Sequence, residues 1–445
     1  MGAGDEVREL FSPGSLIGSM LRFEAALARA EARAGVIPAS AAEAIAAACR
    51  PESFDARAVW REGEAAGTPA IPLVRLLTGS VPAEARGWVH LGATSQDVMD
   101  TAMVIQARSA LDVLGSELRG LAGGCARLAE RYAAVPTPGR TLLQHAVPVT
   151  FGLKAARWLT VVARRARSLA RIRDDLPLQL GGAAGTLAQL GGDGPRVAAL
   201  LGEELELPVP DLPWHAERDR IAELGAALGV TAGAVAKIAG DIVLLSQTEV
   251  GEAAEGADEG AGASSAMPQK RNPVHAVAAV AASRLSLGSV TVLLHAARHE
   301  HERAAGAWQA EWEALPDAFS HTARAVAAVR SSVEGLRVDE DQMRRNLGAG
   351  GGTIMAEALV TALVPGLGRD VAYALVGEVV GRSAREGIDL VDAAVQDDRI
   401  RGALDEEGVR RAIDPLAYLG SADVLVRRAI EASRDVVEGG EGTPG

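Results

Sequence analysis

The chain has 445 residues, of which 48% are hydrophobic and 23% charged, so it can bury a large core and is not disordered as a whole. Its formal net charge of −13 argues against a nucleic-acid-binding protein, which normally presents a basic face. Two cysteines outside any CxxC pair favour a reducing, cytoplasmic location. The N-terminus lacks the apolar core of a signal peptide, and no run of about 18 residues is uniformly apolar, so we expect no membrane span.

Apolar residues recur at helical spacing in several long stretches, which predicts an all-α fold. The first stretch is followed by Gly35 and Pro38, both helix-stop signals. Because the chain is rich in alanine and only 3% aromatic, closely packed helices in a bundle are favoured. The three clearest stretches are Leu16, Met20, Phe23 and Leu27; Val104, Leu111, Leu114, Leu118 and Leu121; and Ile221, Leu224, Leu228, Val235, Ile238, Ile242 and Leu245.

Three blocks follow from these patterns. Residues 1–100 form an N-terminal helical domain, and residues 101–345 form a central domain of long helices. The glycine-rich stretch 346–352 predicts a flexible break, after which residues 346–445 form a C-terminal helical domain.

The segment 251–273, GEAAEGADEGAGASSAMPQKRNP, carries the most chemical information. Its acidic, glycine-rich first half has no apolar anchor and is expected to be a solvated loop. Its second half places two hydroxyls and a lysine directly before Pro273, which is expected to open a helix. Because the start of a helix attracts anions, this arrangement predicts an anion site.

The string SSAMPQKRNP closely resembles the signature of the fumarase/aspartase superfamily. Residues 89–101 and 139–154 resemble the superfamily's other two characteristic regions and occur in the same order. The resemblance covers nearly the whole chain. It implies three helical domains, a twenty-helix core in a homotetramer, active sites that three subunits share, and no metal or other cofactor.

The resemblance also implies elimination, or its reverse, beside a carboxylate of a small polycarboxylate substrate. The intermediate is a carbanion whose charge spreads into the carboxylate, so catalysis needs a proton-transferring group and fixed positive charge. Ser264 would transfer the proton, whereas Ser265 is expected to be structural. Lys270 would act in catalysis by stabilising the intermediate, together with Asn272.

Five further residues are implied by the resemblance to bind substrate carboxylates. Thr94 and Ser95 offer hydroxyls and backbone N–H groups before a helix, and Thr141 and Gln144 would face the same pocket. Arg303 matches a superfamily arginine whose planar fork suits a carboxylate.

Leu142 departs from the pattern of fumarase and adenylosuccinate lyase, which have a histidine directly after the threonine of the second region. That histidine is associated with protonating the departing hydroxyl or amine. Its absence suits a leaving group that is already a stable anion, such as an internal carboxylate or nitrite. His145 lies three residues further on and is either a catalytic acid or a packed histidine.

Several segments are most similar to the superfamily branch of bacterial 3-carboxy-cis,cis-muconate cycloisomerases, including residues 66–77, 179–188 and 306–319. This branch implies lactone formation in aromatic-acid breakdown. Residues 213–224 also match and supply His215 and Arg218 as possible pocket residues. The branch usually has glycine where this chain has Ala263.

Three alternatives remain open. The chain could be a lyase of the same branch that releases an anion such as nitrite from nitrosuccinate and leaves fumarate. An adenylosuccinate-lyase-like enzyme is less favoured, because Trp312 occupies the place of its phosphate-binding arginine. A non-catalytic structural relative would not need the intact loop. His295, His299 and His301 have no zinc-site spacing and are expected to form a solvated or inter-subunit face of one helix.

Overall fold

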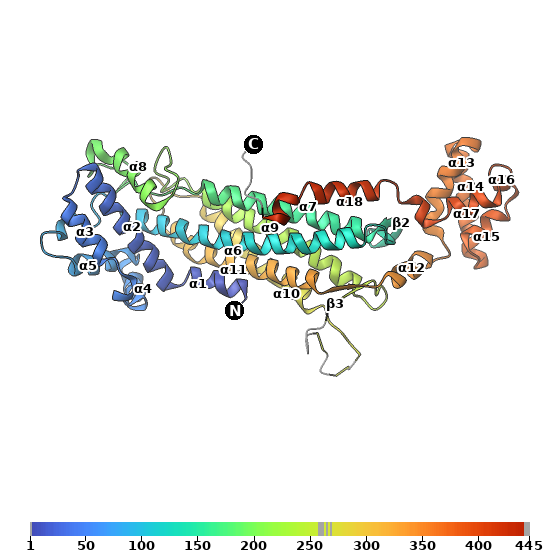
Figure 1. Ribbon diagram of the computed structural model, residues 1–445, viewed down its shortest axis with the longest axis horizontal. Helices are drawn as coiled ribbons and strands as arrows, with labels where there is room; N and C mark the ends of the chain where they lie inside the picture. The colour runs from blue at the N-terminus through green and yellow to red at the C-terminus, as the bar shows by residue number, and fades with distance from the viewer. Residues whose placement is uncertain (1, 257–261, 264–265, 268, 440–445) are drawn as a thin grey trace. The chain divides into compact units, whose positions relative to one another are not determined.

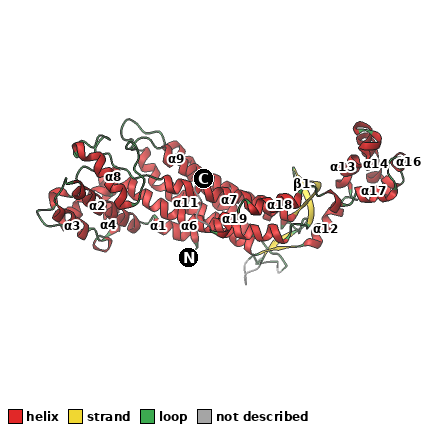
Figure 2. Cartoon of the chain, turned by 45° about the horizontal axis from the view of Figure 1, so that its top comes forward, coloured by secondary structure: helices red, strands yellow, loops and turns green. Residues whose placement is uncertain are grey.

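The computed structural model describes residues 2–256, 262–263, 266–267 and 269–439. Within this part of the chain there are nineteen α-helices and four short strands, so the predicted all-α fold class is confirmed (Figures 1 and 2). The chain divides into two compact units, which are described separately. Unit 1 comprises residues 1–118, 165–236 and 278–328, and unit 2 comprises residues 119–164, 237–277 and 329–445.

Five long helices cover the predicted bundle region. Each carries segments of both units, and all except the last contain one of the predicted apolar stretches or adjoin a characteristic region. They are α6 (Ser95–Arg131), α7 (Phe151–Asp175), α9 (Asp219–Leu245), α10 (Val274–Ala296) and α11 (Ala307–Glu334). The first of them begins at Ser95, so the helix starts already within the region that the sequence assigned to the N-terminal block.

The shorter helices of unit 1 precede the bundle, apart from one that lies between α7 and α9. They are α1 (Ala3–Leu10), α2 (Pro13–Ala34), α3 (Ala39–Ala48), α4 (Ala56–Ala66), α5 (Ala70–Ser80) and α8 (Gly194–Leu205). The predicted stop of α2 is confirmed, since Gly35 adopts a left-handed conformation with φ 78° at the helix C-cap. At the other end, the Ser12 hydroxyl accepts a hydrogen bond from the Ser15 amide. The buried face of α2 packs against α3 and α8.

Close approach of helices in unit 1 depends on residues without bulk. A Cβ atom on Gly225 of α9 would lie 2.8 Å from the Cδ1 atom of Leu293 on α10, so a larger residue would require this leucine side chain to move. The next two helices, α10 and α11, are joined in the core by a hydrogen bond of 2.8 Å between Ser286 and Thr322. These contacts fit the alanine-rich composition, which favours helices at short separation.

Unit 2 contains two antiparallel strand pairs, of which the first is a hairpin, and the C-terminal helices. The sequence did not predict the strands, which are β1 (Pro136–Thr141) paired with β2 (Gln144–Thr150), and β3 (Ala253–Glu255) paired with β4 (Leu336–Val338). The helices are α12 (Glu340–Gly348), α13 (Ala356–Leu367), α14 (Arg369–Glu386), α15 (Leu390–Val395), α16 (Asp398–Arg401), α17 (Glu406–Ala412), α18 (Ala422–Glu431) and α19 (Arg434–Glu438). A buried cluster of aliphatic side chains, among them Leu359, Val376 and Leu390, forms a core for α13 to α17.

The glycine-rich break is shorter than predicted. Helix α12 continues to Gly348, and Asn346 is buried, where its side-chain amide donates to the Val250 carbonyl at 2.8 Å. The irregular backbone is confined to the glycines that follow, since 350, 351 and 352 all have positive φ.

Two helices, α9 and α10, are long and apolar enough to cross a membrane by length and composition alone, each with a mean hydropathy of 1.7. Half of the apolar window of α9 and a third of that of α10 are buried within the structure. Alanine-rich helices that pack in a bundle can therefore be as long and as apolar as membrane spans. The expected lack of a membrane span stays a prediction.

Candidate active site

The first region forms the turn into α6. The Thr94 amide donates to Asp97 Oδ2 at 2.9 Å, and the Asp97 amide donates to the Thr94 carbonyl at 3.0 Å, which fixes the first turn. The half-buried Ser95 hydroxyl has no partner among the described residues. The helix start therefore offers hydroxyl and amide donors to an anion, as the resemblance implies.

Arg303 lies against this turn. Its Nη1 donates to Thr94 Oγ1 at 3.2 Å and its Nε donates to Gln96 Oε1 at 3.1 Å. Its Nη2 donates to the Ala183 carbonyl at 3.2 Å. A guanidinium has about five N–H donors, so about two remain for a ligand. The arginine is thus held in one orientation, with donors left for a carboxylate beside the Thr94 and Ser95 hydroxyls.

Asp97 is fully buried and holds three segments of unit 1 together. Besides the Thr94 amide, its carboxylate accepts hydrogen bonds from the Gly181 and Gly182 amides, both at 2.9 Å. His215 Nε2 lies 2.6 Å from Asp97 Oδ1. The sequence suggested His215 as a possible pocket residue. In the structure it is buried, and it contacts Asp97, the carboxylate that orients Thr94.

His90, at the other end of the turn, is anchored in the same way. Its Nδ1 lies 2.6 Å from Glu24 Oε1 on α2. Burial acts to lower the pKa of His90, but the charge of Glu24 and the hydrogen bond outweigh it and raise the pKa. The turn that carries Thr94 is thus fixed at both ends.

Arg218 lies beneath the Arg303 cluster and is 1% exposed. It forms a two-pronged ion pair with Asp100 at 2.7 and 3.2 Å and another with Glu311 at 2.5 and 3.1 Å. Burial acts to lower the pKa of Arg218, but the charges of both carboxylates outweigh it and hold the pKa above its usual range. Gln96 Nε2 donates to Asp100 Oδ2 at 3.1 Å, which links this network to the Arg303 side chain.

The predicted histidine face is wrong in two respects. Helix α10 ends at Ala296, so His299 and His301 lie beyond it. The imidazole of His299 is fully buried, with Nδ1 3.2 Å from the His215 carbonyl and Nε2 3.4 Å from Glu311 Oε1. Its partners are thus interior groups of unit 1. Among the described residues no group of three or more His, Cys, Asp or Glu side chains could hold a metal ion.

The second region forms the β1–β2 hairpin of unit 2. Thr141 pairs with Gln144 across a two-residue turn, and His145 pairs with Arg140. The turn residues Leu142 and Leu143 have φ of 50° and 65° and are 96% and 72% exposed. Two leucines in the left-handed region cost about 1–3 kcal/mol each, so this exposed tip is strained.

His145 is exposed, and its pKa is lowered. Partial burial is the main cause and the charge of Arg140 adds to it, whereas Glu252 acts in the opposite direction. The imidazole is therefore neutral at pH 7, which makes it a better hydrogen-bonding group than a proton donor.

Residues 252–255, in the first half of the signature segment, are not part of a solvated loop, which corrects the prediction for them. Residues 253–255 form strand β3, and Glu252 is fully buried. Its carboxylate accepts two hydrogen bonds from Arg140, at 2.9 and 2.5 Å, and others from Thr137 and Asn346 at 3.1 and 2.7 Å. A carboxylate with that many partners acts as an anchor, here between the hairpin and α12.

The predicted anion site at the start of α10 is also corrected. The helix begins at Val274, directly after Pro273. Glu255 occupies its N-terminus, where its carboxylate accepts from the His275 and Ala276 amides at 3.0 and 2.8 Å. The chain itself thus supplies the anion that neutralises this helix end.

Ser264 and Ser265 lie outside the described residues. Nearby, the Asn272 amide donates to the Gly262 carbonyl at 2.9 Å, and Ala263 pairs with Arg271. Gly262 has φ 73°, and a Cβ there would lie 2.6 Å from the Asn272 carbonyl oxygen, so glycine is required. Lys270 is exposed, and Asn272 is half-buried. Among the described residues, neither Lys270 nor Asn272 forms a hydrogen bond or ion pair with the hairpin.

The predicted site residues thus form two groups. Unit 1 brings Thr94, Ser95 and Arg303 together. Unit 2 holds Thr141, Gln144 and His145 on its hairpin and Lys270 and Asn272 near the end of the signature segment.

The family model described as "Lyase" matches residues 2–284, which is more than half of the chain. The chain belongs to this lyase family. A second model, described as "Adenylosuccinate lyase C-terminus", matches residues 352–429. Both matches agree with the superfamily that the signature segment indicated, and the chain is an enzyme of the fumarase/aspartase superfamily.

Individual relatives of the lyase family match almost the whole chain. A 3-carboxy-cis,cis-muconate cycloisomerase of Pseudomonas aeruginosa is 45% identical over 95% of this chain and 93% of its own length. A nitrosuccinate lyase of Streptomyces davaonensis is 40% identical over 96% and 93%. The crystal structure of a 3-carboxy-cis,cis-muconate lactonizing enzyme from Pseudomonas putida superposes with a TM-score of 0.90, at 42% identity and 97% coverage of both chains.

Sequence reasoning missed the buried residues that orient the site, namely Gln96, Asp97, Asp100 and Glu311. A signal for the first three was present, because they lie on one face of a helix start between apolar residues that include Val98 and Met99. Polar side chains that are buried in a helical bundle need hydrogen-bond partners. Their position among apolar residues therefore indicates that they belong to a buried hydrogen-bond network.

Replacing Arg303 by lysine is expected to lower kcat/KM by about 100-fold. An ammonium group cannot span Thr94, Gln96 and Ala183 while still presenting a fork to a carboxylate. Steady-state kinetics of the purified variant measure this loss. The matched control is Arg298→Lys, an exposed arginine five residues earlier, which should retain full activity. Equal kinetics of the two variants would remove Arg303 from the site.

Proposed function

We propose that this enzyme is a 3-carboxy-cis,cis-muconate cycloisomerase, which closes a linear triacid to a lactone. The observation that carries the proposal is the arrangement of Arg303, Thr94 and Ser95, a fixed cation and two hydroxyls that suit a carboxylate. The 45% identity to the Pseudomonas aeruginosa cycloisomerase gives the substrate class. A triacid gives each of the proposed binding groups a carboxylate to hold.

The proposed reaction is an internal addition. A carboxylate oxygen of the substrate attacks a carbon of the conjugated diene and forms the ring C–O bond. The displaced electron pair moves to the carbon next to another carboxylate, whose oxygens share the new negative charge. A proton then reaches that carbon, which completes the lactone. By microscopic reversibility, the group that delivers the proton is the one that would remove it in the elimination.

Ser264 is proposed to deliver that proton, with Lys270 and Asn272 stabilising the charge that develops on the carboxylate. Residues on either side of Ser264 are held together, since the Asn272 backbone amide and side-chain amide both donate to the Gly262 carbonyl. Thr94, Ser95 and Arg303 are proposed to bind one substrate carboxylate, and Thr141 and Gln144 another.

Leu142 and His145 favour an anion as the leaving group of the reverse reaction. The exposed leucine has no proton to give, and the lowered pKa of His145 keeps the imidazole neutral at pH 7. A carboxylate needs no protonation to depart, because its own pKa lies well below 7. His145 is therefore proposed to bind substrate by a hydrogen bond or to assist as a weak acid.

A nitrosuccinate lyase activity is the second candidate. The same leucine favours it, because nitrite is also a stable anion, and the Streptomyces davaonensis nitrosuccinate lyase is 40% identical. This alternative keeps the proposed roles of Ser264 and Arg303. It changes only the bond that breaks and the product, which would be fumarate.

The enzyme is further proposed to act as a cytoplasmic homotetramer without a cofactor, whose subunits share active sites. Exposed apolar side chains on α10 support self-association, because such a stripe is costly in water. Val277, Leu285, Leu287 and Leu294 are 53%, 53%, 46% and 50% exposed. Static light scattering on the purified chain measures the assembly directly.

Two spectrophotometric assays test the activity. We expect rapid loss of the ultraviolet absorbance of the 3-carboxy-cis,cis-muconate diene, and no fumarate from nitrosuccinate. Fumarate release with an inert diene would overturn the cycloisomerase and establish the second candidate. Failure of both reactions in a folded tetramer would exclude both.

A further inference from the structure

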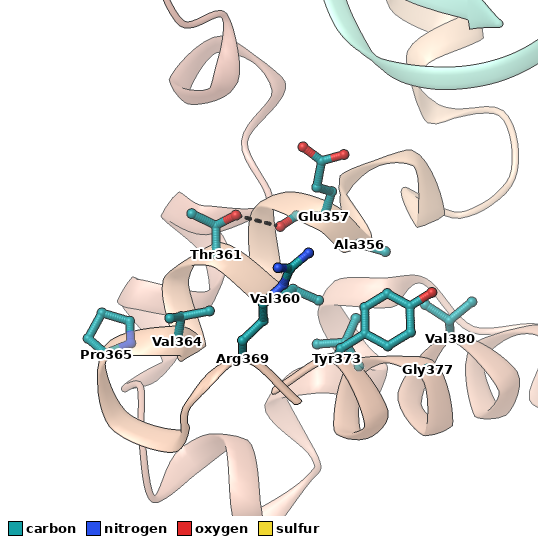
Figure 3. A pocket seen from close by; sticks show the side chains of 11 residues that line it. Ala356, Glu357, Val360, Thr361, Val364, Pro365, Arg369, Tyr373, Gly377 and Val380 are labelled. Carbon is teal, nitrogen blue, oxygen red and sulfur yellow. Dashed lines mark hydrogen bonds between the residues drawn. The ribbon is translucent and has the colours of Figure 1, made fainter. Parts of the chain in front are cut away.

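A cavity of about 730 Å³ lies between α13 and α14 of unit 2, far along the chain from every residue assigned to catalysis (Figure 3). One face of α13 and one face of α14 line it. Its apolar walls come from Val360 and Val364 on the first helix and from Val376 and Val380 on the second. A volume of this size is typical of sites for small organic ligands.

Gly377 is one of the residues that line the cavity. A Cβ atom at this position would meet no other atom within 4 Å, so the missing side chain leaves open space. Glycine weakens a helix interior compared with almost any other residue, and Gly377 lies in the middle of α14. The glycine therefore creates room that a larger residue would fill.

The lining of the cavity includes one basic and one acidic side chain, Arg369 and Glu357. Arg369, the first residue of α14, points from there into the space between the helices (Figure 3) and forms no ion pair or hydrogen bond among the described residues. Glu357 is the acidic residue of the lining, and its carboxylate accepts the Tyr418 hydroxyl at 3.0 Å. The Thr361 hydroxyl donates to the Glu357 carbonyl at 2.9 Å.

A phenol also lines the cavity. Tyr373 lies one turn after Arg369 on the same helix and lines the same cavity. It is 74% exposed, and its hydroxyl has no partner among the described residues. The arginine suits a carboxylate, while the valine walls and the tyrosine ring suit a flat apolar body.

We propose that this cavity binds a small aromatic carboxylate, with the ring between the valines of α13 and α14 and the carboxylate on Arg369. The site differs in character from the proposed catalytic groups, which gather several polar donors and few apolar walls. It is a separate ligand site on the C-terminal helices. The guanidinium of Arg369, which has no partner among the described residues, favours an anion over a neutral ring, and the limited volume favours a small molecule over an extended chain.

Titration calorimetry of the full-length protein with naphthalene-2-carboxylate tests the proposal. We expect one site per chain with a Kd below about 1 mM. Naphthalene-2-methanol, which has the same ring and no charge, is expected to bind about tenfold more weakly. Arg369→Gln should weaken the carboxylate about tenfold and leave the alcohol unchanged.

Gly377→Leu should abolish binding of both compounds, since the new side chain fills the cavity, and it should not harm folding because leucine favours helix. Arg385→Gln on the same helix is the matched control and should bind as the parent does. Circular dichroism, diene turnover and light scattering confirm that each variant is folded and assembled. Equal binding of acid and alcohol, unchanged binding by Gly377→Leu, or no binding by the parent would overturn the proposal. A change of oligomeric state in Gly377→Leu would also overturn it, because that result would identify the cavity between α13 and α14 as part of a subunit interface.

Discussion

Replacing Ser264 by alanine is expected to lower kcat for lactone formation by about 10³-fold, with little change in KM. The hydroxyl is proposed to transfer the proton at carbon, a step that general acid–base catalysis accelerates by about 10²–10⁴. The carboxylate-binding groups near Arg303 lie in unit 1 and stay intact, so substrate should still bind. Diene loss under steady-state conditions, with binding followed separately by calorimetry, measures both quantities.

Ser265→Ala is the matched control, because it removes an adjacent hydroxyl from the same segment. It should change kcat by only a few-fold. Light scattering should show the same assembly for both variants and the parent. If Ser265→Ala were the inactive variant, the two serine roles would be reversed; if both retained activity, another group would deliver the proton.

The sequence was sufficient to predict the helical fold. The periodic apolar stretches in α2, α6 and α9 span several turns each, and Gly35 ends its helix where the stop signal predicted. These features are local, because a residue's neighbours three and four positions away determine which face it shares. The pairing of Arg303 with Thr94 was not predicted: the resemblance to a known superfamily gave each residue a carboxylate-binding role, but some 209 positions separate them in the chain.

The anchoring carboxylates could not be predicted in the same way. Glu252 and Glu255 lie in a segment whose composition resembles a solvated loop, and their partners come from β1, α10, α11 and α12. Composition describes a segment in isolation, whereas the burial of a charge depends on distant groups that neutralise it. The β1–β2 hairpin was missed for a related reason, because its turn consists of two leucines in place of the usual Asn-Gly or Gly-Gly.

Replacing Arg218 by methionine is expected to lower the free energy of unfolding by about 3–5 kcal/mol at pH 8. Methionine fills much of the volume but leaves Asp100 and Glu311 buried without their shared cation. Loss of the arginine should also reduce activity, because Asp100 orients Gln96, which in turn holds Arg303. Urea unfolding followed by circular dichroism measures the change in stability.

The pH dependence identifies the cause of this loss. Without Arg218, burial should raise the pKa of both carboxyl groups in the folded variant above their unfolded values of about 4. The folded variant then binds protons more tightly than its unfolded chain, so its stability falls as pH rises above about 4. The deficit relative to the parent should therefore be largest at pH 8 and shrink toward pH 5. Arg220→Met, two residues further on α9, removes a half-buried arginine that forms no ion pair among the described residues, and it should show neither effect. A deficit that is constant with pH would mean that lost packing, not the two unpaired carboxylates, destabilises the variant.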